Sequence, residues 1–254
     1  IYILLIFNVN NFLNKIFVSI VFKLLLTNKI LLSLQMDSIE FWSVCASNGL
    51  PLSQEQMASF ERYANDLLYW NEKVNLISRR DTEQIWLRHL LHSLTPILMK
   101  FIPDVKSKIL DIGSGGGLPG IPLKIAYPKI EMILLDSIAK KVQTTSMLAS
   151  HITKFGLKSI RNRAEEMPND PNSKIKFDFV VSRAVAPLVD LMKWSKPILK
   201  PDSPIVTLKG GDLTNEILQA QTKFPLAKIE VFDIEIEGTD WFLTEEKKIV
   251  KVNF

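Results

Sequence analysis

Two different hydrophobic periods divide this chain near residue 105. Between residues 37 and 100, apolar side chains recur every three or four positions, as they do along one face of a helix. From residue 108 onward, short apolar runs alternate with helical stretches. The sequence therefore predicts a small helical domain over 36–105 and an α/β domain over 106–254.

Helix-start signals divide the first part further. Asp37 is a candidate N-cap, and Ser53 followed by Gln56 is a capping box, in which each residue satisfies a free N–H of the other. Asp81 with Gln84 repeats this spacing. We expect a helix to begin at each of these three points.

The second part alternates strands and helices. The apolar runs predict strands at 108–112, 131–136, 159–161, 178–182, 204–208, 227–232 and 247–252. The amphipathic stretches predict helices at 119–127, 138–155, 187–199 and 213–223. Such alternation predicts a parallel sheet with helices on both faces. Because no helix separates the last two strands, we expect an antiparallel hairpin across Gly238 to Thr244. A mostly parallel sheet with one antiparallel strand is the outline of class I (Rossmann-like) methyltransferases.

A glycine loop follows the first of these strands. Residues 110–122 read Leu-Asp-Ile-Gly-Ser-Gly-Gly-Gly-Leu-Pro-Gly-Ile-Pro. Such a loop lets backbone N–H groups approach a ligand with no side chain in the way. Asp136 ends the next strand, 23 residues after Gly113, close to where nucleotide-binding folds place the acid that binds a ribose. The loop and the acid together predict a cofactor that contains adenosine.

The glycine spacing by itself leaves alternatives open. Gly113-x-Gly115-x-Gly117 fits a methyltransferase, whereas Gly115-x-Gly117-x-x-Gly120 fits a dinucleotide-binding protein. An NAD(P)-dependent oxidoreductase would need a second half-fold or a Tyr/Lys or His catalytic set, and the sequence shows neither. A tight turn that binds nothing is the structural alternative.

The charge distribution and the cysteine content limit the possible partners, metal sites and cellular compartment. Of the net charge of +4, three units come from lysines in residues 1–35, so the remaining sequence is close to neutral. Any nucleic-acid surface must therefore be a local patch. Cys45 is the only cysteine, which excludes an internal disulfide and fits a reducing, cytoplasmic compartment. Three histidines and one cysteine leave little room for a structural zinc site, so we expect no metal.

Residues 1–35 form a hydrophobic leader of a different composition. Its longest apolar run, from Ile16 to Leu26, is interrupted by Ser19 and Lys23 and is shorter than the roughly 20 residues of a membrane span. No small-residue cleavage site is visible. Because Met36 opens an ordinary sequence, we interpret the leader as not part of the native protein and a membrane partner as improbable. A membrane anchor is the alternative.

Several strings, in matching order and spacing over roughly residues 40–252, resemble one family, the RsmG (GidB) 16S rRNA guanine-N7 methyltransferases. They are Trp70-Asn71 with Asn75-Leu76, Arg88-His89-Leu90-Leu91, Asp111 to Leu123, Leu135-Asp136-Ser137, Ser182-Arg183-Ala184 and Leu208-Lys209-Gly210. The resemblance implies methyl transfer from S-adenosylmethionine to N7 of a guanine in small-subunit rRNA. It implies 16S rRNA or the small ribosomal subunit as partner, and no stable protein partner. One departure is His92, where the family commonly carries Asp.

Site residues are transferred position by position. The candidate cofactor-binding residues are Gly113, Gly115, Gly117, Leu118, Asp136, Ala164, Glu165 and Arg183. The candidate contacts to rRNA are Arg80, His89 and Lys209. By resemblance, Ala164 and Glu165 would flank the adenine. Arg183, at the end of the fourth strand, would suit the cofactor carboxylate, guanine O6 or a phosphate.

The expected chemistry assigns no catalytic residue. Guanine N7 presents a free lone pair, so no general base is required. Cytosine-C5 transfer needs a cysteine nucleophile, and Cys45 lies far in sequence from the sheet. Ser-Arg-Ala-Val-Ala-Pro stands at 182–187, where adenine-N6 enzymes often carry an Asn-Pro-Pro-Tyr type motif. A methyltransferase that acts on a small molecule or a protein is the alternative function.

Overall fold

The computed structural model describes residues 35–169 and 175–254. Residues 37–254 form one compact unit. Apart from residue 35, the predictions about the leader fall outside the described residues. Within the described ranges, no helix combines the length and the apolar character needed to cross a bilayer.

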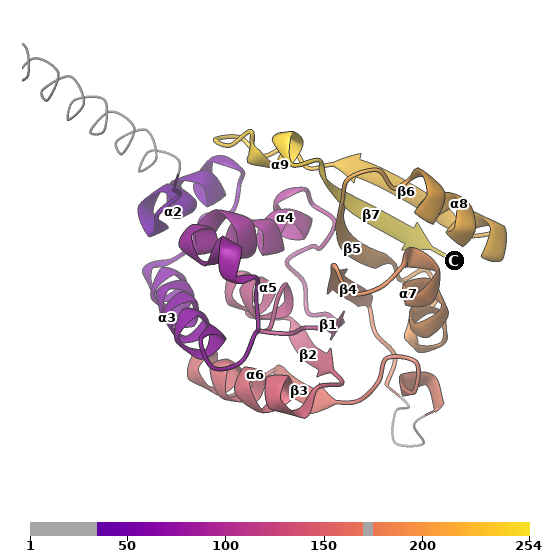
Figure 1. Ribbon diagram of the computed structural model, residues 1–254, viewed down its shortest axis with the longest axis horizontal. Helices are drawn as coiled ribbons and strands as arrows, with labels where there is room; N and C mark the ends of the chain where they lie inside the picture. The colour runs from indigo at the N-terminus through magenta and orange to yellow at the C-terminus, as the bar shows by residue number, and fades with distance from the viewer. Residues whose placement is uncertain (1–34, 170–174) are drawn as a thin grey trace, which may run out of the picture. The chain divides into compact units, whose positions relative to one another are not determined.

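Seven strands form a single sheet in the order β3-β2-β1-β4-β5-β7-β6 (Figure 1). The strands are β1 (Lys108–Ile112), β2 (Glu131–Asp136), β3 (Leu157–Arg161), β4 (Phe179–Arg183), β5 (Ile205–Gly210), β6 (Lys228–Asp233) and β7 (Lys247–Asn253). The pairs among β1 to β5 are parallel, and β7 runs antiparallel to both β5 and β6. The predicted fold class is therefore confirmed, including the late hairpin, and each strand lies within two residues of its predicted bounds.

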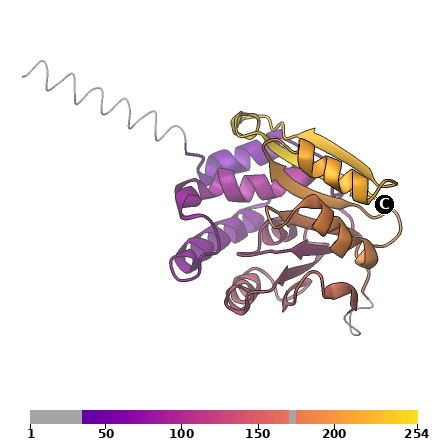
Figure 2. The same cartoon turned by 45° about the vertical axis from the view of Figure 1, so that its right-hand side comes forward.

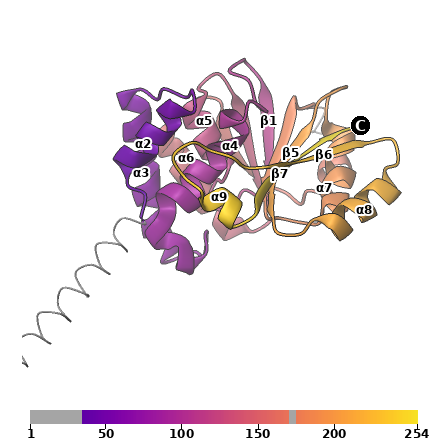
Figure 3. The ribbon, with the colours of Figure 1, turned by 90° about the horizontal axis from the view of Figure 1, so that it is seen from above.

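Helices cover both faces of the sheet. They are α2 (Ser38–Ser47), α3 (Gln54–Asn71), α4 (His92–Leu98), α5 (Gly120–Ala126), α6 (Ala139–Ile152), α7 (Leu188–Ser195), α8 (Thr214–Lys223) and α9 (Trp241–Thr244). The described residues also form three 3-10 helices, η1 (Arg79–Gln84), η3 (Met167–Asn169) and η4 (Lys196–Ile198), and one π-helix, η2 (Ile85–Leu91). Seen from above, α2 to α6 lie on one side of the sheet and α7 and α8 on the other (Figure 3).

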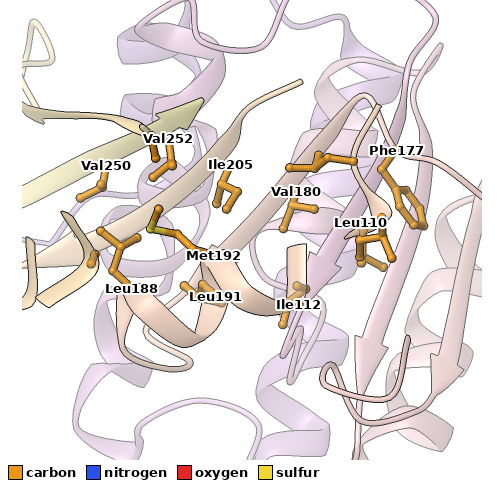
Figure 4. Packing of buried hydrophobic residues seen from close by; sticks show 14 of the residues in the cluster. Leu110, Ile112, Phe177, Val180, Leu188, Leu191, Met192, Ile205, Val250 and Val252 are labelled. Atoms are coloured by element: carbon orange, nitrogen blue, oxygen red, sulfur yellow. The ribbon is translucent and has the colours of Figure 1, made fainter. Parts of the chain in front are cut away.

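The core under α7 fixes the central strands. Leu188 and Met192 of α7 pack in one buried cluster with Val180 of β4, Ile205 of β5 and Val250 of β7 (Figure 4). Each of these side chains is at most 1% exposed. Burying such a side chain contributes roughly 1.5–3 kcal/mol, so the sheet is a firm base for the loops at its edge.

Two of the predicted helix starts are confirmed. The Asp37 carboxylate accepts hydrogen bonds from the N–H groups of Ile39 and Glu40 and so caps α2. Ser53 and Gln56 form the expected reciprocal capping box at the start of α3.

The third predicted start, at Asp81, is wrong. A 3-10 helix begins after Ser78, whose side chain caps it, and continues directly into the π-helix η2. Asp81 Oδ1 instead accepts from Arg88 Nη1 at 2.6 Å, and Gln84 Oε1 accepts from Arg88 Nε at 2.8 Å. The side chains of Asp81 and Gln84, which would have capped a helix, are thus both bound to the guanidinium of Arg88.

The helical segment is attached to the helices of the sheet. α3 packs against α5 and α6, and α4 packs against α5 (Figure 2). The Gln56 side-chain amide donates to the carbonyls of Ile125 and Ala126, each at 2.9 Å, at the end of α5. The domain boundary near residue 105 stays a prediction.

Candidate functional site

A cavity of about 460 Å³ lies at the carboxyl edge of the sheet. The chain builds β1, β2 and β3 outward in one direction and then returns to place β4 on the other side of β1. Open α/β sheets bind ligands at such a switch point, outside the carboxyl ends of the strands. The lining residues come from the loops after these strands and from Leu76 and Trp194: Leu76, Ile112–Gly116, Leu118, Leu135–Ile138, Lys141, Asn162–Glu165, Arg183–Val185 and Trp194.

The glycine loop forms the floor at the end of β1. The N–H groups of Gly113 and Ser114 both donate to the Leu135 carbonyl, at 2.8 and 3.0 Å, which ties the loop to β2. Gly113 has φ +68°, and a Cβ there would lie 2.6 Å from the Val185 methyl groups. A side chain at this position would therefore be strained and would also collide with the loop after β4.

Seven of the eight predicted cofactor residues line this cavity, and Gly117 does not. Gly117 has φ +99°, and a Cβ there would lie 2.4 Å from Ile121 Cδ1. Its carbonyl accepts from the Ile121 N–H at 2.7 Å in the first turn of α5. The structure thus places Gly117 where the loop joins the helix.

Asp136 is held rigidly at the end of β2. Its Oδ2 accepts from the Gly115 N–H at 3.0 Å, and its Oδ1 accepts from the Ile138 N–H at 2.9 Å. A carboxylate has about four lone-pair sites, so each oxygen can accept one further hydrogen bond. The side chain is therefore oriented to receive two hydroxyl groups from the cavity.

The loop after β3 supplies both apolar and charged side chains to the cavity wall. Ala164 and Glu165 both line the cavity, and Arg163 Nη1 lies 3.4 Å from Glu165 Oε1 in a surface ion pair. Ile138 also lines the cavity and is half exposed. Apolar groups at 138 and 164 suit a flat aromatic ring.

Arg183 places a half-buried guanidinium at this edge. Its Nη1 donates to the Arg88 carbonyl at 3.2 Å, and its Nη2 donates to His89 Nδ1 at 2.9 Å. In residues 35–169 and 175–254, no carboxylate lies within ion-pair distance of it. Ala184, which follows, has φ +53°, a left-handed conformation that costs a non-glycine residue about 1–2 kcal/mol.

The three predicted rRNA contacts lie apart from the cavity lining. His89 is 5% exposed and stands behind Arg183, and burial lowers its pKa to about 3. Lys209 ends β5, where its Nζ donates to Glu216 Oε1 and to the Ala186 carbonyl, both at 2.6 Å. Arg80 is exposed on η1. Of the three, only Arg80 presents its side chain to the surface.

A buried carboxyl group lies beneath the glycine loop. Asp111 Oδ2 accepts from the Gly120 N–H at 2.8 Å, while Oδ1 has no hydrogen-bond partner among the described residues. Burial raises the Asp111 pKa to about 8. This side chain fixes the start of α5 and does not line the cavity.

Leu76 is a cavity residue that the site prediction left out. Asn71 Oδ1 accepts from the N–H groups of Leu76 and Ile77, at 2.8 and 2.9 Å, and folds the segment after α3 back on itself. This turn brings Leu76 to the glycine loop, where its carbonyl lies 3.4 Å from a Cβ built at Gly115. The signal was present in the paired strings Trp70-Asn71 and Asn75-Leu76, which carry part of the family resemblance.

Comparison with known proteins agrees with this geometry. The GidB family, described as rRNA small subunit methyltransferase G, matches residues 56–241. Ribosomal RNA small subunit methyltransferase G of Streptococcus pneumoniae serotype 19F (strain G54) is 37% identical over 193 residues, covering 76% of this chain and 81% of the relative. The Streptococcus agalactiae serotype V (strain ATCC BAA-611 / 2603 V/R) protein of the same name is 36% identical over 181 residues, covering 71% and 76%. An O-methyltransferase from Bacillus cereus in complex with SAH superimposes with a TM-score of 0.51 at 12% identity, covering 76% and 90%, a likeness of fold.

Proposed function

The chain belongs to the GidB family of rRNA small subunit methyltransferases G, and from this premise we propose the reaction that its cavity serves. It transfers a methyl group from S-adenosylmethionine to N7 of a guanine in 16S rRNA. The observation that carries the proposal is a switch-point cavity that combines an oriented carboxylate, Asp136, with a guanidinium, Arg183, that has no carboxylate within ion-pair distance among the described residues.

The residues of the cavity fit the cofactor group by group. The free lone pairs of Asp136 suit the two ribose hydroxyls, and the apolar wall at Ile138 and Ala164 suits adenine. The guanidinium of Arg183 suits the carboxylate of the methionine part, since a charged donor and a charged acceptor form the stronger kind of hydrogen bond. Gly113 leaves space for a ligand against the loop.

The reaction does not require the protein to remove a proton from its substrate. When bound, the cofactor supplies a methyl group on a positively charged sulfur. N7 of guanine already carries a lone pair, so the chain must place that nitrogen in line with the methyl group and exclude water. A cation directly at N7 would oppose the positive charge that forms there. This charge argument assigns Arg183 to the cofactor carboxylate or to guanine O6.

Basic and aromatic side chains near the cavity are the proposed rRNA surface. Lys141 and Arg163 line the cavity, and Arg80 is exposed on η1. The Lys73 ammonium lies 3.7 Å from the ring centroid of Tyr69, which is 54% exposed. Exposed cations that neutralise phosphates, together with an aromatic face for a base, are the usual means of holding single-stranded RNA. His89 and Lys209 are proposed to support this edge from behind.

The setting follows from the substrate. The 16S rRNA, free or within the small ribosomal subunit, places the reaction in the cytoplasm. The chemistry requires neither a membrane nor a stable protein partner. The helical segment before residue 105 would then face the rRNA beside the cavity.

Methylation of purified 16S rRNA tests the proposal. The rRNA is taken from cells that lack this protein, incubated with the full chain and S-adenosylmethionine, and mapped by mass spectrometry. One guanine should gain a methyl group at N7, and Asp136→Ala should remove the modification. An rRNA that stays unmodified as naked RNA and within the small subunit would overturn the proposal.

A further inference from the structure

The guanidinium of Arg183 is half-buried and has no carboxylate within ion-pair distance in the described part of the chain, and two groups of η2 hold it. They are the carbonyl of Arg88 and Nδ1 of His89. Withdrawing a cation from water without a directly paired anion is costly, so two neutral acceptors in this place need a reason. We infer that His89 is a positioning residue, which holds the Arg183 guanidinium at the cavity wall for the carboxylate of the cofactor. The inference rests on the proposed function for the identity of that ligand.

The protonation state of His89 follows from its hydrogen bond. Every nitrogen of a guanidinium carries hydrogen, so Arg183 is the donor and His89 Nδ1 is the acceptor. The imidazole must therefore be neutral, with its proton on Nε2. Burial acts in the same direction, since it disfavours the charged form of His89.

The π-helix explains how one short segment supplies both contacts. The Arg88 side chain is engaged elsewhere, because Asp81 and Gln84 hold its guanidinium at 2.6 and 2.8 Å. The Arg88 backbone carbonyl and the neighbouring ring of His89 are then free to face Arg183. π-Helical turns are rare and are frequently found at functional sites, and this one presents two acceptors to a single cation.

A neutral acceptor can position the Arg183 guanidinium and leave its charge intact, whereas a carboxylate would neutralise that charge. Arg183 uses two of the five N–H donors of a guanidinium on η2. The other three donors and the full positive charge remain available at the cavity, which Arg183 lines. His89 thus fixes the direction of the cation without cancelling its charge.

Three substitutions at one position separate positioning from packing. In His89→Asn, the side-chain oxygen stands close to the place of Nδ1 and keeps the acceptor. His89→Gln puts its oxygen closer to the place of Nε2, and His89→Leu removes the acceptor. Leu91→Val, in the same helix and fully buried, is the matched control that loosens packing without touching the contact.

The measurement is the dissociation constant for S-adenosylhomocysteine by calorimetry on the full chain, with the melting temperature recorded for each variant. We expect His89→Leu and His89→Gln to weaken binding 10- to 100-fold, and His89→Asn and Leu91→Val to stay within about threefold of wild type. A His89→Leu protein that binds like wild type, or a folded His89→Asn protein as weak as His89→Leu, overturns the inference. Failure of wild-type protein to methylate 16S rRNA would instead count against the proposed function and leave this binding comparison intact.

Discussion

The ends of two adjacent strands, β4 and β5, present two cations in opposite situations. Lys209 at the end of β5 is ion-paired with Glu216 at 2.6 Å, and its side chain is 10% exposed. Arg183 at the end of β4 is half-buried and, within the described residues, its side chain donates to neutral acceptors only. Burying a charge is tolerated when a partner offsets it. Lys209 therefore has a structural partner inside the chain, whereas Arg183 is left for a ligand.

The same contrast predicts where stability and function separate. A residue that strengthens ligand binding but lowers the stability of the ligand-free protein is typical of functional sites. Arg183, together with the left-handed backbone of Ala184, fits that description, whereas Lys209 and Glu216 fit an ordinary stabilising pair. Substitutions at Arg183, Lys209 and His89 test this difference.

The largest expected effect is that of Arg183→Leu. Removing the cation should lower kcat/KM for methyl transfer by 10²- to 10³-fold, because a charged hydrogen bond to the ligand is lost. The free energy of unfolding of the ligand-free protein should change little, because an unpaired charge disappears while the Arg88 carbonyl and His89 Nδ1 lose their donor. Steady-state kinetics and urea unfolding on the same preparation measure both quantities.

Lys209→Met is the matched control for that variant. It leaves Glu216 partly buried without its partner, so unfolding should become easier by about 1–3 kcal/mol. Its kcat/KM should stay within a few-fold of wild type. If Lys209→Met lost activity as severely as Arg183→Leu, or if Arg183→Leu failed to fold while Lys209→Met was stable, the distinction between the two strand ends would be lost.

Giving Arg183 its own counterion should break the contrast. In His89→Asp, a carboxylate would stand near the place of Nδ1, so Arg183 would resemble Lys209. The ligand-free melting temperature should be unchanged or higher, while S-adenosylhomocysteine should bind roughly 10-fold more weakly, since two carboxylates then compete for one cation. Thermal melts with and without the ligand measure both effects. A variant that binds the ligand more tightly than wild type would contradict the assignment of Arg183.

Asp111, beneath the same loop, predicts how stability depends on pH. Its pKa is raised to about 8, so the folded state holds a proton that the unfolded state has already released. The stability that this group contributes is complete below the unfolded pKa, and it is lost as the pH rises toward 8. The neutral histidines His89 and His92 have lowered pKa values and act in the opposite sense, an effect that fades as the pH rises through the unfolded value of about 6.5.

The difference between wild type and Asp111→Asn in chemical unfolding between pH 6.5 and 8 isolates Asp111. Relative to that variant, wild-type stability should fall by up to about 2 kcal/mol over this interval, from roughly 1.4 kcal/mol per pH unit. Asp111→Asn keeps an acceptor for the Gly120 N–H and should show a much flatter profile. Equal slopes for the two proteins would mean that Asp111 is ionised in the folded state across this range.

The extent to which these features can be read from sequence differs between the fold and the site. The strands were predictable because each is a short apolar run between polar or glycine-containing segments, and the spacing of Gly113 and Asp136 located the cavity. The π-helix was not predictable, since it depends on Arg88 being held by Asp81. The sequence shows a cation such as Lys209, but it does not show that its counterion is Glu216 in the first turn of α8. Contacts of this kind can be identified only in the folded chain.

Arg80 adds a third cation, exposed to solvent, and carries the smallest expected effect. Its side chain makes no hydrogen bond or ion pair in the part of the chain that the structure describes, and its backbone N–H donates to Ser78 Oγ at 3.3 Å. If its side chain neutralises one rRNA phosphate, Arg80→Ala should weaken rRNA binding a few-fold. It should also reduce the slope of log K against log salt by roughly 0.7–0.9, while S-adenosylhomocysteine affinity stays unchanged. Filter binding at several salt concentrations measures the slope, with the exposed Lys228→Ala on β6 as control, because Lys228 pairs with Glu230 and lies on the edge strand beyond β7. An Arg80→Ala slope equal to that of the control would remove Arg80 from the rRNA surface and confine that surface to the cavity mouth.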